Sequence, residues 1–232
     1  MTKRPWISAE ELMADLQRDS AYLEQQKSLA RERSARQERI RALHAPILED
    51  YRRIGVVANS IEDLVARYAP LPENIVDRLL AWISASQEPD VLEPLVRALA
   101  ATTLPYDGRP VVDVFSKTDS EFVQWAAANT LATTSPTGVA AWVADAVRDP
   151  RYGRARDMLV MALARLASPA EANRVLVSIF DEIPTQVTDA LAISGGPSEL
   201  AFLQSKQGDY RGATRKQIDK AIRRLQKRLA RP

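Results

Sequence analysis

One short apolar pattern returns along the chain at a nearly constant interval. Its copies are Ala98-Leu99-Ala100, Thr130-Leu131-Ala132, Ala162-Leu163-Ala164, Ala190-Leu191-Ala192 and a weaker Ala221-Ile222. Their central residues lie 32, 32, 28 and 31 positions apart, a length that fits two short helices with their turns. A helix pair of this length cannot bury its apolar face alone, so successive pairs must stack around one continuous core. The recurrence predicts an all-α fold, a right-handed α-solenoid of about five stacked antiparallel helix pairs.

Turn-forming residues divide the repeating part of the chain into short helices, because proline or a glycine pair stands at many of the expected turns. The first helices of the pairs are predicted at residues 72–85, 108–117, 137–148, 169–180 and 197–206. The second helices are predicted at residues 89–101, 120–133, 153–167, 184–194 and 212–230. Pro94 falls near enough to the start of its helix for a proline to be tolerated in the first turn.

The start of the chain does not follow this pattern. We expect an N-terminal helical extension over residues 1–50 and the solenoid, with a basic capping helix at its end, over residues 51–232. Ser8 and Glu11 have the spacing of a capping box, which predicts a short amphipathic helix at the beginning of the extension.

A longer, charged helix is expected to follow in the extension. Ser20 can cap its start, and it should end near His44, because Pro46 disfavours helical backbone at the residue before it. Its heptad-spaced positions include a glutamine and two arginines, which argues against a stable coiled coil. The apolar residues between 40 and 48 are therefore expected to pack on the body while the preceding turns stand in solvent.

The two-helix period and the Ala-Leu-Ala endings resemble HEAT repeats of the short bacterial type. In that family the second helix often carries an arginine seven positions before the leucine. Arg156 and Arg215 match this position, whereas Leu92, Gln124 and Pro184 depart from it. The Ser8-Ala9-Glu10-Glu11-Leu12 segment also resembles the lead-in of bacterial HEAT-repeat proteins. The resemblance implies a protein-interaction scaffold and supplies no catalytic positions.

Composition limits the remaining classes of protein. Apolar residues make up 46% of the chain and charged residues 27%, which excludes wholesale disorder. The chain contains no cysteine, so disulfides and cysteine-ligated metals are excluded. No stretch approaches the roughly 20 apolar residues of a membrane span, and the apolar run of a signal peptide is missing. A cytoplasmic protein with no membrane partner is expected.

No catalytic constellation is predicted, and neither a cofactor nor a metal is expected. The only histidine, His44, is expected at the surface near a helix end, so no triad or histidine-pair metal site can form around it. Four recurring carboxylates are expected to be helix caps, turn contacts or solvated charges. They are Asp113, Asp145, Asp157 and Asp189.

The tryptophans of the chain suggest one alternative in which the protein is an enzyme. DNA glycosylases with a HEAT-like fold use aromatic residues and a carboxylate on a basic concave surface. Trp125 and Trp142 lie near acidic sequence instead, so this alternative is less favoured, and Trp82, Trp125 and Trp142 are expected to pack in the core.

Charge is distributed unevenly between the ends and the middle of the chain. Residues 27–41 carry a net charge of +4 and residues 206–232 carry +8, whereas the whole chain carries +2. The last predicted helix has an apolar stripe surrounded by cations, which makes it the sharpest candidate for partner binding. These cations are Lys216, Lys220, Arg223, Arg224, Lys227 and Arg228.

Two interpretations of this last helix remain open. It can be the polar cap that ends the stack, or it can bind an acidic partner or a phosphate backbone. The preferred function is a non-enzymatic protein-protein interaction scaffold. The alternative is a nucleic-acid-associated HEAT-like protein that uses its basic terminal helices.

Overall fold

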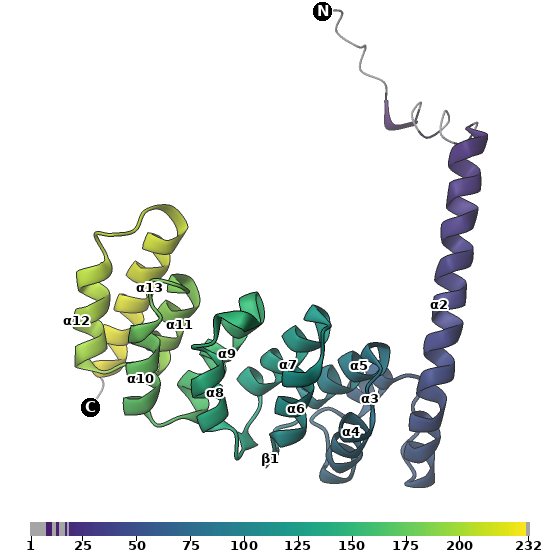
Figure 1. Cartoon of the computed structure of the whole chain (residues 1–232), viewed down its shortest axis with the longest axis horizontal. Coiled ribbons are helices and arrows are strands. Elements are labelled where there is room, and N and C mark those ends of the chain that lie inside the picture. Colours follow the sequence, from purple (N-terminus) through teal and green to yellow (C-terminus); the bar gives the residue numbers. More distant parts are fainter. Residues whose placement is uncertain (1–7, 11–12, 14–16, 18, 231–232) are drawn as a thin grey trace, which may run out of the picture.

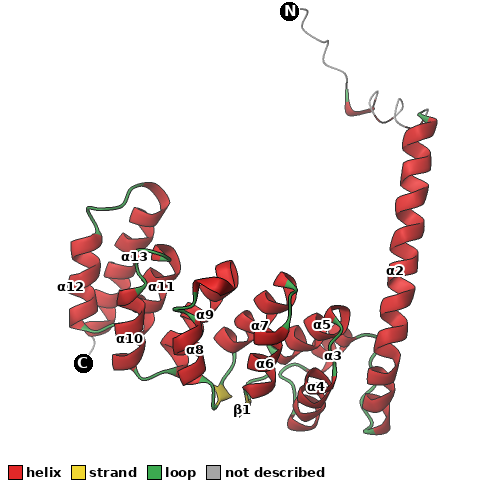
Figure 2. Cartoon of the chain, in the orientation of Figure 1, coloured by secondary structure: helices red, strands yellow, loops and turns green. Residues whose placement is uncertain are grey.

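The computed structural model describes residues 8–10, 13, 17 and 19–230. Within these residues the chain is almost entirely helical, which confirms the expected all-α class (Figure 2). The expected capping box of Ser8 with Glu11 depends on a residue outside the described part of the chain.

The repeating part contains two rows of helices that contact each other in pairs. The even-numbered row consists of α4 (Glu73–Ala85), α6 (Arg109–Lys117), α8 (Ala140–Ala146), α10 (Pro169–Ser178) and α12 (Pro197–Lys206). The odd-numbered row consists of α5 (Pro89–Leu99), α7 (Glu121–Thr133), α9 (Arg156–Leu166), α11 (Pro184–Ser194) and α13 (Gly212–Leu229). Each even-numbered helix contacts the helix that follows it, and neighbouring helices of the odd-numbered row contact one another from α5 to α13 (Figure 1).

The repeated leucines lie at the centre of this arrangement. Leu99, Leu131, Leu163 and Leu191 are all 0% exposed, and Ile222 is also buried. Small neighbours of these residues let adjacent helices approach closely. Thr130 Oγ1 donates a hydrogen bond of 2.8 Å to the Val96 carbonyl of the preceding odd-numbered helix. The apolar recurrence therefore marks positions that pack in the shared core.

A second repeated position stabilises the ends of the even-numbered helices. Gln124, Arg156 and Arg215 lie seven residues before the repeated apolar residue, and each donates a hydrogen bond to the C-cap carbonyl of the preceding helix. The acceptors are Thr118 at 3.2 Å, Val147 at 3.3 Å and Gln207. These bonds satisfy carbonyls that a helix end leaves without an intrahelical partner. Gln124 thus departs from the arginine pattern in residue type but makes the equivalent contact.

Two helices begin three residues later than predicted. One is α9, which starts at Arg156 after a 3₁₀ helix over Pro150–Ala155. The other is α8. The structure starts α8 at Ala140, whereas the sequence predicts a helix from 137. Pro136–Thr137 forms β2, which pairs in parallel with β1 (Tyr106–Asp107) in the only ladder among the described residues. Gly138 follows with a φ of 74°, a conformation that favours glycine. The helix begins after this turn.

The charged helix α2 (Ser20–Arg53) corrects two expectations. Asp19, and not Ser20, caps its start, because Asp19 Oδ1 accepts a hydrogen bond of 2.9 Å from the Ala21 amide. The helix does not end near His44 but continues through Pro46 to Arg53. Apolar packing beyond the proline outweighs the lost backbone bond, since Ile47, Leu48 and Tyr51 are buried. The expected boundary between residues 50 and 51 falls inside this helix.

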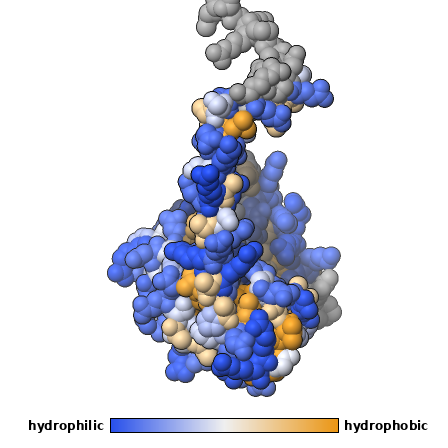
Figure 3. Space-filling view, turned by 90° about the vertical axis from the view of Figure 1, so that its right-hand side faces the viewer, coloured by the Kyte–Doolittle hydropathy of each residue, from blue (hydrophilic) through white to orange (hydrophobic). Residues whose placement is uncertain are grey.

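Most of α2 stands outside the body. Figure 1 shows α2 rising beside the first helix pairs, and Figure 3 shows a mostly hydrophilic column above a base where hydrophobic residues gather. The body contacts α2 mainly through α5 and α4. A short helix, α3 (Ile61–Tyr68), follows and packs against α5.

A proline explains how α2 attaches to α5. Pro94 is the sixth residue of α5, beyond the first turn where the sequence placed it, and it cannot donate to the Asp90 carbonyl four residues earlier. His44 Nε2 lies 2.9 Å from this carbonyl. A carbonyl oxygen only accepts, so this ring nitrogen is the donor. His44 is thus buried, and it lies within α2 rather than at its end. The expectation of a surface position at a helix end was wrong.

The Asp90 side chain strengthens the same attachment. Its carboxylate accepts hydrogen bonds from Arg36, at 3.3 Å, and from Arg39 on α2. Burial raises the pKa of Asp90, but the hydrogen bonds from Arg39 and Arg36 outweigh this effect and hold the pKa below its usual value. Asp90 therefore joins α2 to α5 through both its backbone and its side chain.

Candidate interaction surfaces

Most of the cations predicted as a binding surface are exposed on α13. Lys216, Lys220, Arg223, Arg224 and Lys227 all face solvent. The apolar stripe on the opposite side is buried through Ile218, Ile222 and Leu225, whereas Leu229 at its end is exposed. The apolar side of α13 thus packs against the neighbouring helices α11 and α12.

Arg228 differs from the other predicted cations. Its Nη1 donates to the Ala192 carbonyl at 3.2 Å, and its Nη2 donates to the Gly195 carbonyl. Both acceptors lie at the C-terminal end of α11, where a helix has unsatisfied carbonyls and a partial negative charge. Arg165 makes the same kind of bond, 3.0 Å long, to the Ala132 carbonyl at the end of α7. Arg228 is therefore engaged in helix packing and is not a free surface cation.

The structure reveals an exposed aromatic pair that the sequence reasoning missed. Phe122 is 77% exposed and Trp125 is 43% exposed, both on α7. The prediction that Trp125 packs in the core was wrong. Helical geometry could have found Phe122, because it lies nine residues before buried Leu131 and thus about 180° away around the helix.

The neighbours of Trp125 in space differ from its neighbours in sequence. The Arg97 guanidinium carbon lies 5.3 Å from the centre of the Trp125 ring, within the range of a cation–π interaction. A hollow of about 650 Å³ begins at the aromatic pair and extends to the N-terminal end of α9. Its lining includes Arg151, Arg154 and Asp157. The acidic sequence around Trp125 therefore does not describe its surroundings.

Asp157 is the most buried carboxylate in this hollow. Burial raises the pKa of its carboxyl group, and the nearby charges of Arg154 and Arg156 act in the opposite direction. Its Oδ2 accepts a hydrogen bond of 3.4 Å from Gln186. The hollow thus combines aromatic rings, cations and one partly desolvated acid.

A second hollow lies on the other side of Phe122. It has a volume of about 390 Å³ and is bordered by Arg36 and Ile40 of α2 and by Pro94 of α5. Phe122 belongs to both hollows. The aromatic pair therefore occupies a position between the base of α2 and the start of α9.

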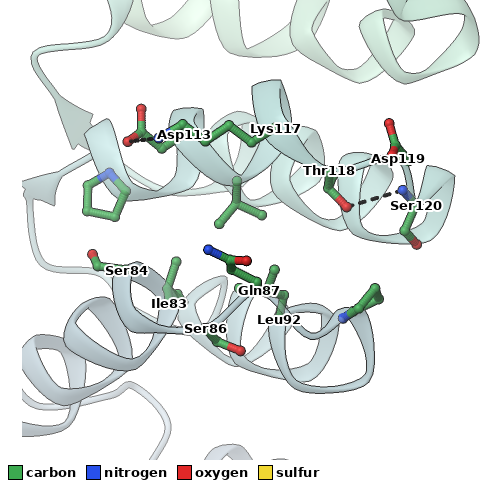
Figure 4. Close-up of a pocket in the computed structure, with 13 residues that line it drawn as sticks. Ile83, Ser84, Ser86, Gln87, Leu92, Asp113, Lys117, Thr118, Asp119 and Ser120 are labelled. Atoms are coloured by element: carbon green, nitrogen blue, oxygen red, sulfur yellow. Dashed lines mark hydrogen bonds and ion pairs between the residues drawn. The ribbon is translucent and has the colours of Figure 1, made fainter.

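A third hollow, shown in Figure 4, lies between the end of α4 and α6. It has a volume of about 550 Å³. Asp113 in its wall pairs with Lys117 at 2.9 Å, and the Ser120 amide donates to Thr118 Oγ1 at 3.2 Å. The ion pair is largely exposed and joins residues one helical turn apart, which is typical of a solvated helix surface.

The remaining predicted residues occupy structural positions. Asp145 pairs with Arg148 on the surface, and Asp189 accepts a hydrogen bond from Gln217 of α13. The two other tryptophans within the described residues are partly buried against the core. Trp82 Nε1 donates to Asp50 at 3.1 Å, and Trp142 meets Phe115 edge-on with ring centres 5.4 Å apart.

Neither a metal-binding cluster nor a membrane-spanning helix occurs in the described part of the chain. Among residues 8–10, 13, 17 and 19–230, no group of three or more histidine, aspartate or glutamate side chains is placed to hold a metal ion. In the same part of the chain, no helix combines the length and apolar character needed to cross a bilayer. Comparisons with family models, curated proteins and solved structures found no match.

Proposed function

We propose that this chain is a HEAT-like α-solenoid that binds a protein partner through the aromatic pair on α7. The observation that carries the proposal is the exposure of Phe122 and Trp125 side by side on one helix face. Large aromatic side chains and arginine supply most of the binding energy in protein interfaces. Large apolar side chains that are exposed next to each other are also a common mark of interaction surfaces.

The fold supports the solenoid part of the proposal. Helices of the odd-numbered row contact one another in succession, and the repeated leucines are buried at equivalent places. The shared C-cap contact of Gln124, Arg156 and Arg215 occurs at the same position in three of the five helix pairs. A stack of this kind presents an extended surface on which a partner can lie across several repeats.

The surroundings of the aromatic pair define what the partner must offer. An apolar side chain of the partner would cover Phe122 and Trp125. Polar groups of the partner would bind Arg97, Arg154 and Asp157 in the hollow of about 650 Å³. The adjoining hollow at the base of α2 extends the same contact. In this function the chain positions a partner, and no catalytic step or cofactor is assigned to it.

Affinity capture from nuclease-treated lysate tests this function. The wild-type chain is compared with the double variant Phe122→Ala and Trp125→Ala, and captured proteins are quantified by mass spectrometry. Val57, which is also exposed but lies between α2 and α3, provides the control substitution Val57→Ala. We expect one defined protein to be retained by the wild type and the control and reduced at least about tenfold by the double variant. Equal recovery by all three would contradict the proposal.

A further inference from the structure

Four cations of α13 form one straight row. Lys216, Lys220, Arg223 and Lys227 are separated by four, three and four residues. At 100° per residue they fall within a sector of about 60°, and they span about 16 Å along the helix axis. All four side chains are exposed. We call these four residues the cation row.

The cation row forms no ion pair among the described residues, unlike many other cations of this chain. Within the described residues none of its four members has a carboxylate within ion-pair distance. The one acid of α13, Asp219, is already bound by Arg215 at 3.0 Å and by Gln207 at 2.6 Å. These hydrogen bonds, from Gln207 and Arg215, lower the pKa of Asp219, and the nearby charge of Arg223 acts in the same direction. The row therefore presents four cations to solvent, with Asp219 as the one carboxylate of the helix beside them.

We infer that the cation row binds the phosphate backbone of duplex DNA without reading its sequence. This inference concerns another surface and another class of partner than the proposed protein binding, and it does not depend on that proposal. One strand of duplex DNA carries a charge about every 3.4 Å along the axis, so a row of about 16 Å runs past roughly five phosphates. Binding releases the counterions condensed on those phosphates, which is the driving force.

Other anionic partners fit the surface less well. A helix that binds a lipid surface must offer a free apolar face, but Ile218, Ile222 and Leu225 are buried in the body. α13 contains no aromatic residue on which single-stranded bases could stack. The row also contains none of the aromatic anchors typical of protein interfaces. Phosphate contact needs only the exposed cations that are present.

Fluorescence anisotropy with a labelled 24-base-pair duplex of mixed sequence tests this inference on the full chain. Binding is measured between 50 and 250 mM NaCl. The row variant replaces all four members by glutamine. A matched control removes the same charge from four exposed cations that have acidic partners, with the substitutions Arg52→Gln, Arg67→Gln, Arg109→Gln and Lys117→Gln. Melting temperatures establish that both variants are folded.

We expect the row variant to bind at least about tenfold more weakly than wild type at 50 mM NaCl. Its plot of log affinity against log salt should be shallower by about 3.6, which is 0.9 for each lost phosphate contact. The control should keep the wild-type slope. Loss of binding in both variants to the same extent, or no binding by the wild type, would overturn the inference. Equal competition by polyglutamate and unlabelled duplex at matched charge would assign the surface to acidic proteins instead.

Discussion

The two terminal helices α2 and α13 are both basic in sequence but use their cations differently. In α2 the cations lie at many angles around the helix, and Arg36 and Arg39 are bound to Asp90 of α5. In α13 four cations share one face and have no acidic partner among the described residues. The net charge of a segment therefore does not define a binding surface. The position of each cation relative to the buried face decides what it can contact.

The two helices also differ in how they are held. α13 is buried in its middle, from Ile218 to Leu225, through one apolar face. In α2 the buried residues begin at His44, so its N-terminal part makes few contacts with the body. One helix completes a core, and the other is attached by its last turns.

The largest expected difference concerns leucine side chains on the two helices. Leu225→Ala should lower the free energy of unfolding by about 2–5 kcal/mol, because Leu225 is fully buried and its loss leaves a cavity. Leu23→Ala on exposed α2 should change it by less than about 0.5 kcal/mol. Urea unfolding monitored by circular dichroism measures both. Similar losses for the two variants would show that α2 is packed along its whole length.

His44→Ala tests the attachment of α2 to α5. It should cost about 1–3 kcal/mol, because the Asp90 carbonyl loses its donor at a position where Pro94 cannot replace it. His44→Gln keeps an N–H donor and should recover part of the loss. Hydrogen exchange of the α2 amides provides a local measurement, with faster exchange expected around residues 40–51. Unchanged exchange in His44→Ala would contradict the proposed role of this bond.

Within α13, neighbouring cations should behave differently. Arg228→Met removes the donors that cap α11 and should cost about 1 kcal/mol. Lys227→Met, one residue away and exposed, should stay within about 0.5 kcal/mol of wild type. Thermal unfolding of the two variants is sufficient to compare them. A larger loss of stability in Lys227→Met than in Arg228→Met would contradict the view that Arg228 stabilises helix packing and Lys227 does not.

The smallest expected effect is the pH dependence of the ion pairs at Asp90. Its pKa is lowered in the folded state, so the folded chain binds this proton less readily than the unfolded chain. The stabilisation is thus complete above the unfolded value of about 3.9 and is lost as the pH falls through the folded-state pKa. Asp90→Asn should cost about 0.5–1 kcal/mol at pH 7, because Arg36 and Arg39 are mostly exposed. This difference from wild type should shrink below pH 4 in urea unfolding.

Much of the helical order of the repeats could be predicted from the sequence. The interval between the apolar patterns and the proline turns predicted the helices from α4 to α13 to within a few residues in most cases. This succeeded because each pair uses local signals, namely a turn residue at its boundary and apolar residues at helical spacing. The exceptions were α8, where a two-residue ladder to a distant segment precedes the helix, and α9, where a 3₁₀ helix containing Gly153 at a φ of 50° precedes it.

Features that depend on tertiary contacts were harder to predict. Pro46 is a local signal for a helix end, but buried residues beyond it hold α2 in a helical conformation. The position of His44 depends on a carbonyl that Pro94 leaves unsatisfied in another helix. Gln124 makes the C-cap contact through a different side chain from arginine. The exposed Phe122 could have been predicted, since the register of Leu131 already fixed the buried face of α7.

The attachment of α2 near one end makes it a lever. Its 34 residues extend about 51 Å at 1.5 Å per residue. Arg36 is the first residue of the described helix with an ion pair to the body, so about 24 Å of rod lie beyond it. A rotation of about 10° about the Arg36 contact would therefore move the tip by about 4 Å. Because Asp90 joins this part of α2 to α5, and α5 also carries Arg97 against Trp125, a single helix links α2 to the aromatic pair.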